Sequence, residues 1–88
     1  MANQLNPLRD KIDQIDQKIL KLIEQRFQIA EKIAQHKTKT PIRNLERENQ
    51  VLENWLSQKI LSSETFISKI VKLILQESRN IQKRFLNK

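Results

Sequence analysis

The 88-residue sequence contains no cysteine and no glycine. Without cysteine, disulfide bonds are excluded, and with one histidine a zinc site lacks its usual ligands. Without glycine, the sequence has no loop of the kind that cradles phosphates or dinucleotides, and tight hairpins that need a positive φ would be strained. Strong helix formers dominate instead, namely Leu, Lys, Gln, Glu and Arg. The composition therefore predicts an all-α protein in which residues 1–88 form one domain.

Long apolar runs and aromatic residues are also scarce. No stretch approaches the roughly 20 apolar residues that cross a membrane, and residues 1–10 lack the apolar region of a signal peptide. With the absence of cysteine, this predicts a cytoplasmic protein without a membrane partner. The formal net charge of +7 favours an anionic ligand or nucleic acid. Because the basic residues form no stripe with interleaved aromatics, we expect no nucleic-acid partner.

The first predicted helix is long, covering about 32 residues from near Asn6–Pro7 to a point before Pro41. Asn6 would cap this helix and Pro7 would stand in its first turn. One apolar seam with heptad spacing consists of Leu5, Leu8, Ile12, Ile15, Ile19, Leu22, Ile29 and Ile33. A second seam beside it consists of Leu20, Ile23, Phe27, Ala30 and Ala34, and its extensions meet Arg9 and Lys37.

This predicted helix is longer than its own domain should be. It would span about 48 Å, whereas a compact domain of this size has a radius of gyration near 12 Å and a diameter of about 30 Å. Its two seams also need more apolar partner surface than two short helices supply. We therefore predict a homodimer, because association is a common way for so small a domain to gain stability.

Two shorter helices are predicted after the first. The second runs from about Leu45 to Lys59, with Asn44 as its cap. Its buried side carries Val51, Leu52, Trp55 and Leu56. The third is capped by Ser62 or Ser63 and runs to about Leu86. Its inward residues are Phe66, Ile67, Ile70, Val71, Ile74, Ile81 and Phe85.

Several polar residues interrupt these apolar faces, and burying a charge without a partner is costly. They are Arg26 in a heptad core position, Arg9 and Lys37 at the ends of the second seam, and Glu48, Ser78 and Gln82 on the later helices. Each alone has a structural explanation, such as setting register, snorkelling, or bonding back to its own helix. Together, several cations with one carboxylate and one amide favour a buried polar pocket for an anion.

The chain resembles the all-helical (AroQ-class) chorismate mutases over essentially its whole length. The resemblance rests on Leu8-Arg9-Asp10-Lys11-Ile12-Asp13, Ile15-Asp16, Leu22-Ile23-Glu24-Gln25-Arg26, Lys37, Pro41-Ile42-Arg43, Arg47-Glu48, Glu77-Ser78-Arg79 and Gln82, in this order. It implies three helices per chain in an intertwined six-helix homodimer. It also implies the rearrangement of chorismate to prephenate in phenylalanine and tyrosine biosynthesis, without metal or cofactor.

The resemblance assigns the residues that would touch the substrate. Arg26, and Arg9 from the partner protomer, would bind the two carboxylates of chorismate. Lys37 and Gln82 would donate to the ether oxygen, with Lys37 also touching a carboxylate. Glu48 would accept the ring hydroxyl. Lys37, Gln82 and Glu48 are therefore the expected catalytic residues.

Other positions have supporting or undecided roles in the resemblance. Arg47 and Ser78 would support the pocket wall. Asn44 stands where many relatives have Asp, which leaves its part in hydroxyl binding open. The loops at 38–40 and 60–64 are about as short as the pattern permits, so closure over the site can differ.

The expected reaction breaks a carbon–oxygen bond and forms a carbon–carbon bond within one molecule, so it needs no nucleophile and no proton transfer. Fixed cations can instead hold a near-attack geometry and stabilise charge on the ether oxygen. Two alternatives remain. One is an isochorismate-pyruvate lyase of the same fold, with an aminodeoxychorismate mutase as a further variant. The other is a non-enzymatic basic helical oligomerisation module. The Arg47–Glu48 pair, with its hydroxyl acceptor, favours the mutase.

Overall fold

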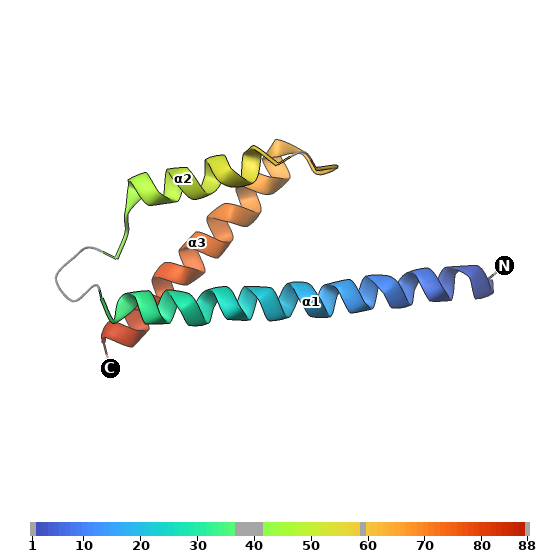
Figure 1. The fold of residues 1–88 in the computed structure, drawn as a ribbon, viewed down its shortest axis with the longest axis horizontal. Helices are drawn as coiled ribbons and strands as arrows, with labels where there is room; N and C mark the ends of the chain where they lie inside the picture. The colour runs from blue at the N-terminus through green and yellow to red at the C-terminus, as the bar shows by residue number, and fades with distance from the viewer. Residues whose placement is uncertain (1, 37–41, 59, 88) are drawn as a thin grey trace.

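In the computed structural model, the described residues are 2–36, 42–58 and 60–87, with the side chains of residues 2 and 3 left out. They form the helices α1 (Ala2–Ala34), α2 (Leu45–Leu56) and α3 (Glu64–Leu86), and this part of the chain contains no strand (Figure 1). The helices confirm the predicted all-α fold with a long first helix.

Helix α1 has 33 residues and a length of about 50 Å. The predicted start at Asn6–Pro7 is wrong, because the helix begins at Ala2 and contains Pro7. A proline inside a helix removes one backbone hydrogen bond and crowds the carbonyl four residues earlier. Here the loss affects only the terminal turn, and good helix formers such as Ala2 and Leu5 precede the proline. The other end agrees with the prediction, since the helix stops at Ala34.

Side-chain caps set three of the remaining helix ends. The Oδ1 atom of Asn44 accepts from the backbone N–H of Arg47 at 3.0 Å and starts α2 as predicted. The α2 helix ends at Leu56, short of the predicted Lys59, because the Ser57 hydroxyl donates to the carbonyl oxygen of Asn54 at 2.8 Å. Lys59 itself lies outside the described residues. In α3, the cap is Ser63, whose Oγ atom accepts from the N–H of Phe66 at 3.2 Å.

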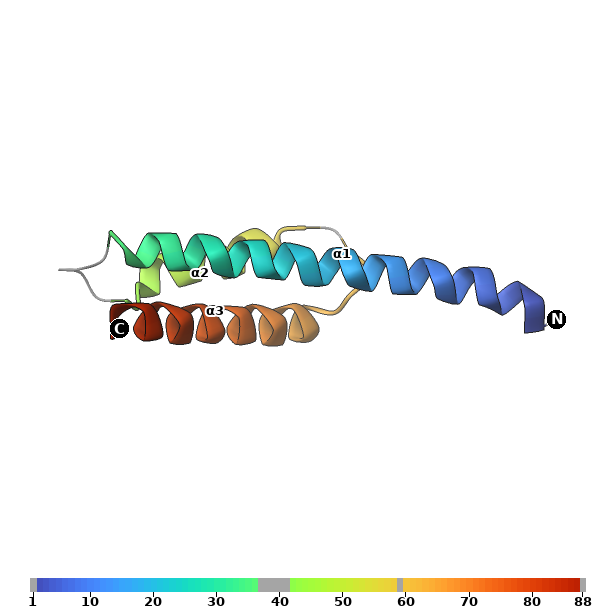
Figure 2. The same cartoon turned by 90° about the horizontal axis from the view of Figure 1, so that it is seen from below.

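Helix α3 is the element against which both other helices pack. Between α2 and α3 lies a small core of Val51, Ile67 and Val71, surrounded by the partly buried Leu52, Trp55, Leu56 and Leu75. Ala30 and Ala34 are the buried residues of α1, and the two views show α1 crossing α3 at its C-terminal end (Figures 1 and 2). Within the described ranges, α1 and α2 make no close backbone contact with each other.

The single chain is elongated, and the N-terminal half of α1 extends beyond the other two helices (Figure 2). Its extents are 60 × 29 × 14 Å and its radius of gyration is 16.8 Å, against about 12 Å for a compact domain of this length. Every residue of the heptad seam is 43–63% exposed. The second seam is buried against α3 only in its C-terminal part, and Leu20 remains exposed. The first helix therefore carries a long apolar face that its own chain does not cover.

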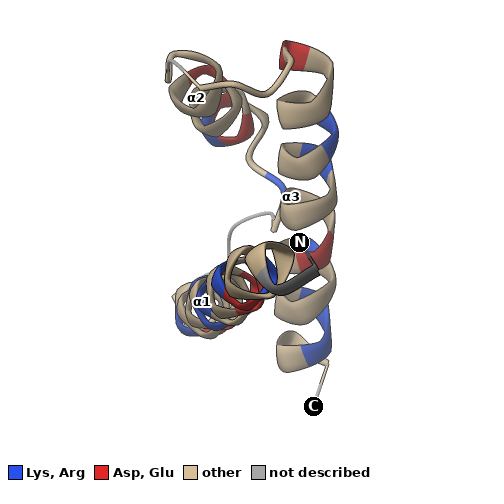
Figure 3. Cartoon of the chain, turned by 90° about the vertical axis from the view of Figure 1, so that its right-hand side faces the viewer, with Lys and Arg blue, Asp and Glu red and all other residues tan. Residues whose placement is uncertain are grey.

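Each helix carries both basic and acidic residues (Figure 3). None of the described helices combines the length and apolar character needed to cross a membrane.

Candidate active site

A cavity of about 410 Å³ lies between the C-terminal half of α1, the start of α2 and the C-terminal half of α3. Six of the predicted site residues line it: Arg26, Asn44, Arg47, Glu48, Ser78 and Gln82. They come from three segments far apart in the sequence. The structure therefore brings most of the predicted polar residues to one place.

The structure describes only one of the two remaining predicted residues, Arg9, and it does not line this cavity. Lys37 lies outside the described residues. Arg9 is exposed on α1, 17 residues before Arg26 on the same helix. At 1.5 Å per residue, the two positions are separated by about 25 Å along the helix axis. An arginine side chain cannot cover that distance, so Arg9 cannot reach the cavity of its own chain.

The rest of the cavity wall is mainly apolar, consisting of Ile29, Ala30, Ile33, Ile42, Val51 and Leu75. The sequence pattern assigned Ile29 and Ile33 to the heptad seam, and Ala30 to the second seam. Their place in the cavity wall depends on how α2 lies relative to α1, which the periodicity of one helix does not reveal. Apolar walls exclude water and strengthen the electrostatic interactions of the cations beside them.

Arg26 is a half-buried cation without a carboxylate partner. Its NH1 atom donates to the Oγ atom of Ser78 at 3.3 Å, and no carboxylate of the described residues lies within ion-pair distance of it. Burial lowers the pKa of Arg26 from its ordinary value, and the positive charge of Arg47 lowers it further. A guanidinium still holds its proton at neutral pH, so Arg26 presents a positive charge that an anion could neutralise.

Gln82 is buried, and its orientation is fixed by the main chain of α1. Its Nε2 atom donates to the carbonyl oxygen of Ala30 at 3.0 Å. A primary amide has two N–H groups, so this bond leaves one donor for a ligand. Ser78 lies one helical turn before Gln82 and is also buried, which places both on one face of α3.

Glu48 is held by two arginines that were not among the predicted site residues. Its Oε2 atom accepts from NH1 of Arg79 at 2.6 Å, and its Oε1 atom lies 3.5 Å from Nε of Arg43. Arg79 also lines the cavity. The sequence held one signal for such cationic partners, Glu48 itself, because a carboxylate on an apolar face requires a cationic partner.

Asn44 and Arg47 lie at the start of α2, on the cavity wall. The side-chain oxygen of Asn44 is occupied by the helix cap described above. Arg47 is exposed, and its NH1 atom lies 3.4 Å from Oε1 of Gln50. Arg47 therefore contributes positive charge at the cavity rim.

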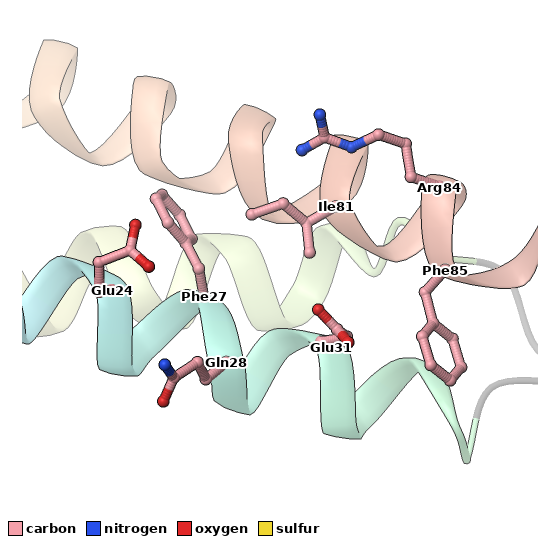
Figure 4. Close-up of a pocket in the computed structure, with 7 residues that line it drawn as sticks. All are labelled: Glu24, Phe27, Gln28, Glu31, Ile81, Arg84 and Phe85. Carbon is pink, nitrogen blue, oxygen red and sulfur yellow. The ribbon is translucent and has the colours of Figure 1, made fainter.

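Charge distinguishes this cavity from the others. Its described lining residues include three arginines and one glutamate, Arg26, Arg47, Arg79 and Glu48, for a formal charge of +2. A second cavity of about 300 Å³ contains Glu24, Glu31 and Arg84, for a formal charge of −1 (Figure 4). There Phe27 points toward α3, Ile81 points toward α1, and Arg84 pairs with Glu77 at 3.1 Å. A third cavity, beside Trp55, has no charged residue among the lining residues that the structure describes. An anion is thus favoured in the first cavity.

Metal chemistry has no evident site in the part of the chain that the structure describes. It contains no group of three or more His, Cys, Asp or Glu side chains that could hold a metal ion.

The family model for chorismate mutase type II matches residues 8–83. The chain belongs to this family. This matched range contains all the lining residues of the cationic cavity. The chain therefore contains a chorismate mutase domain of the all-helical class, and the resemblance found in the sequence is confirmed.

Individual relatives agree with this assignment. The chain is 38% identical over 90 residues to a bifunctional chorismate mutase/prephenate dehydratase of Buchnera aphidicola, and 37% identical to one of Enterobacter agglomerans. These alignments cover 98% of this chain but only 23% of the length of those relatives. Identity to a chorismate mutase of Methanocaldococcus jannaschii is 33%, over 98% of this chain and 91% of that protein.

The fold is also similar to a crystal structure of chorismate mutase from Helicobacter pylori in complex with prephenate. The TM-score is 0.90 at 26% sequence identity, and the match covers 98% of this chain and 97% of that one.

Proposed function

We propose that this chain rearranges chorismate to prephenate in the cationic cavity, in the biosynthesis of phenylalanine and tyrosine. The observation that carries the proposal is the half-buried Arg26, which has no carboxylate partner among the described residues, in a cavity of formal charge +2. Chorismate carries two carboxylates, so its charge complements the cavity. Membership in the chorismate mutase family and the prephenate complex of the Helicobacter pylori relative support this substrate.

The cations would position the substrate. Arg26 and Arg9 are proposed to bind one carboxylate each, because a guanidinium and a carboxylate can pair through two parallel hydrogen bonds that fix orientation. Holding the enolpyruvyl side chain over the ring converts binding energy into a near-attack geometry. Arg47 would add positive charge at the rim, and Ser78 would hold the guanidinium of Arg26 through the 3.3 Å contact.

Gln82 and Lys37 are proposed to act on the ether oxygen. This oxygen gains negative charge as the carbon–oxygen bond breaks, so a donor there binds the transition state better than the substrate. The second N–H of the Gln82 amide is suited to this role, because the bond to Ala30 already fixes the first. Removing one such donor typically costs about 3 kcal/mol, or roughly a hundredfold in rate.

Glu48 is proposed to accept the ring hydroxyl, through the carboxylate oxygen that faces Arg43 at 3.5 Å. Asn44 is proposed to hold the start of α2, and with it Arg47 and Glu48, at the cavity wall. The rearrangement requires no electron carrier and no group carrier, so we propose that it proceeds without metal or cofactor.

The site is proposed to be completed in an intertwined homodimer of six helices. The heptad seam of α1 is exposed along its whole length in the single chain, which favours packing against the same seam of a second copy. Because Arg9 lies about 25 Å along the helix from Arg26, the partner's copy is the one proposed to enter the cavity. We further propose a cytoplasmic location, which the absence of cysteine favours.

The test is incubation of the purified chain with chorismate, with loss of chorismate absorbance and identification of the product. Prephenate is expected. Arg26→Ala should abolish most of the activity, whereas Arg84→Ala, on α3 outside the cavity, should leave it unchanged. Salicylate and pyruvate from isochorismate, with no prephenate from chorismate, would favour the lyase. No turnover of either substrate would favour the oligomerisation module.

A further inference from the structure

The two arginines that bind Glu48 do so very unequally. NH1 of Arg79 lies 2.6 Å from Oε2 of Glu48. The side chain of Arg79 is 23% exposed and that of Glu48 is 16% exposed. The contact with Arg43 is 3.5 Å long, and the Arg43 side chain is 60% exposed. The carboxylate therefore has one short, mostly buried ion pair and one long, solvent-exposed ion pair.

This inequality determines which partner a ligand can replace. A short charge-assisted bond away from solvent fixes both groups, whereas an exposed ion pair is screened and contributes little. A hydroxyl that enters the cavity can displace Arg43 from the Oε1 atom at small cost. The Oε2 atom stays with Arg79, so the carboxylate keeps its position during binding.

The same pair sets the charge that a ligand meets. Glu48 is the one carboxylate among the described lining residues, and Arg79 neutralises it. Among the lining residues that the structure describes, the remaining charges are those of Arg26 and Arg47. A neutral hydroxyl can donate to Glu48 in this environment. A protonated amine at the same ring position would also be attracted by Glu48, but Arg79 on the other carboxylate oxygen offsets that attraction, and Arg26 and Arg47 add repulsion.

We propose that Arg79 is a specificity-determining residue, which makes the cavity select a ring hydroxyl over a ring ammonium at the position that contacts Glu48. The inference rests on the proposed function and refines its substrate class. The discriminating ligand is 4-amino-4-deoxychorismate, in which a primary amine replaces the ring hydroxyl. A primary alkyl amine is protonated at neutral pH, as the Lys side chain is.

The first experiment measures kcat/KM at neutral pH for chorismate and for the amino analogue, in the unmodified chain and in Arg79→Gln. The substitution removes this cation and leaves Glu48 with only the long, exposed ion pair to Arg43. We expect the ratio of kcat/KM for the amino analogue to kcat/KM for chorismate to rise by about tenfold or more. Arg79→Lys keeps the positive charge but not the planar fork, so it should lower kcat/KM for chorismate while the ratio stays low.

The matched control is Arg84→Gln, which removes an exposed arginine of the same helix, outside the cavity. It should leave the ratio unchanged. A ratio that stays constant in Arg79→Gln, or that rises equally in Arg84→Gln, overturns the inference. If the unmodified chain turns over chorismate but the kcat/KM ratio is the same in Arg79→Gln, this inference alone is overturned. No turnover of chorismate by the unmodified chain overturns the proposed function as well.

A second measurement uses only the unmodified chain and does not depend on whether a variant folds. The amino analogue loses its ammonium charge as the pH rises through the pKa of its amine, which titration of the free compound gives. The ratio of kcat/KM values should rise over that pH range, because the neutral amine is no longer repelled. A ratio that does not change with pH overturns the inference, since the discrimination would then not depend on charge.

Discussion

The side-chain amide of Gln82 on α3 donates a hydrogen bond to the main-chain carbonyl of Ala30 on α1, at 3.0 Å. A main-chain carbonyl of α1, which no substitution removes, thus orients a side chain of the distant helix α3. The bond also defines which end of the amide carries the nitrogen, because a carbonyl oxygen can only accept. This orientation makes a specific pH prediction for a substitution at position 82.

Gln82→Glu should make activity fall as the pH rises. A carboxyl donates only while protonated; a free Glu has a pKa near 4.3, and burial would raise the pKa of the introduced group. Its ionised form would repel the Ala30 carbonyl and the developing charge on the ether oxygen. The protonated form has one O–H for two acceptors, so kcat/KM should stay below that of the unmodified chain even at low pH.

The measurement for this variant is kcat/KM from about pH 4.5 to pH 8, alongside thermal unfolding. Because the introduced carboxyl has a raised folded-state pKa, its stabilising contribution is present below the unfolded pKa and is lost as the pH rises. Gln76→Glu, at an exposed position of α3, is the control and should keep the unmodified profile. An unmodified profile for Gln82→Glu would show that Gln82 does not contact the ether oxygen.

Arg9→Ala and Arg26→Ala should each be inactive alone and should recover activity when mixed. In a mixed dimer, one site would combine the intact Arg26 of one chain with the intact Arg9 of the other. Random subunit exchange makes half of the dimers mixed, each with one intact site, so about a quarter of the sites should be active. The rate of prephenate formation after confirmed exchange checks this.

A matched control separates shared sites from general stabilisation by mixing. Arg26→Ala mixed with Gln82→Ala should stay inactive, because both residues line the cavity of the same chain. Recovery in this control, or none in the Arg9→Ala mixture, would mean that Arg9 does not act across the dimer.

Ile15→Asp should separate the dimer. Ile15 lies in the middle of the exposed seam of α1, and an unpaired carboxylate buried in an interface costs about 2 kcal/mol or more. Two-fold symmetry introduces the cost twice, so association should weaken by about a thousandfold. Sedimentation should give the 10.5 kDa chain mass for the variant and twice that for the unmodified chain. Gln17→Asp, on a polar side of the helix, should remain dimeric, and an active unmodified monomer would contradict the prediction.

Two helix caps allow an effect on activity to be separated from an effect on stability, because loss of either cap should lower stability by a similar amount. Asn44→Ala and Ser63→Ala each remove one side-chain acceptor from a helix N-terminus, which should cost about 1 kcal/mol and be measurable as a lower Tm. Only Asn44→Ala should reduce kcat/KM, because Ser63 lies away from the cavity. Asn44→Asp should keep the cap and its stability. An equal loss of activity in both alanine variants would assign the effect to stability alone.

Periodicity and capping chemistry predicted most of the fold. The third helix follows its Ser63 cap and ends at Leu86, within the predicted bounds, because a serine cap and an unbroken apolar face leave few alternatives. The errors occurred where local signals compete. Pro7 is compatible with a helix that begins just before it or with a helix that begins a turn earlier, and the prediction selected the first start. At the end of α2 the Ser57 hydroxyl bonds back to Asn54, and the sequence alone does not reveal which serines will do so.

The candidate site was predictable where a polar residue interrupted an apolar face. Arg26, Ser78 and Gln82 stood out in this way, and the cavity contains all three. Arg43 and Arg79 did not, because an arginine beside other charged residues resembles an ordinary exposed cation. The contact of Arg79 with Glu48 depends on the distance between the start of α2 and the C-terminal half of α3. That distance is a property of packing rather than of any one helix.

The separation of α1 and α2, each of which packs on α3 alone, has a consequence for rigidity. A dianion bound between Arg26 and Arg47 would link these two helices directly and supply a contact that the folded chain lacks. Amide hydrogens near the C-terminal end of α1 should then exchange more slowly with solvent when the cavity is filled. Dissociation of product would remove that link, so the rigidity of the chain would rise on binding and fall on product release in every catalytic cycle.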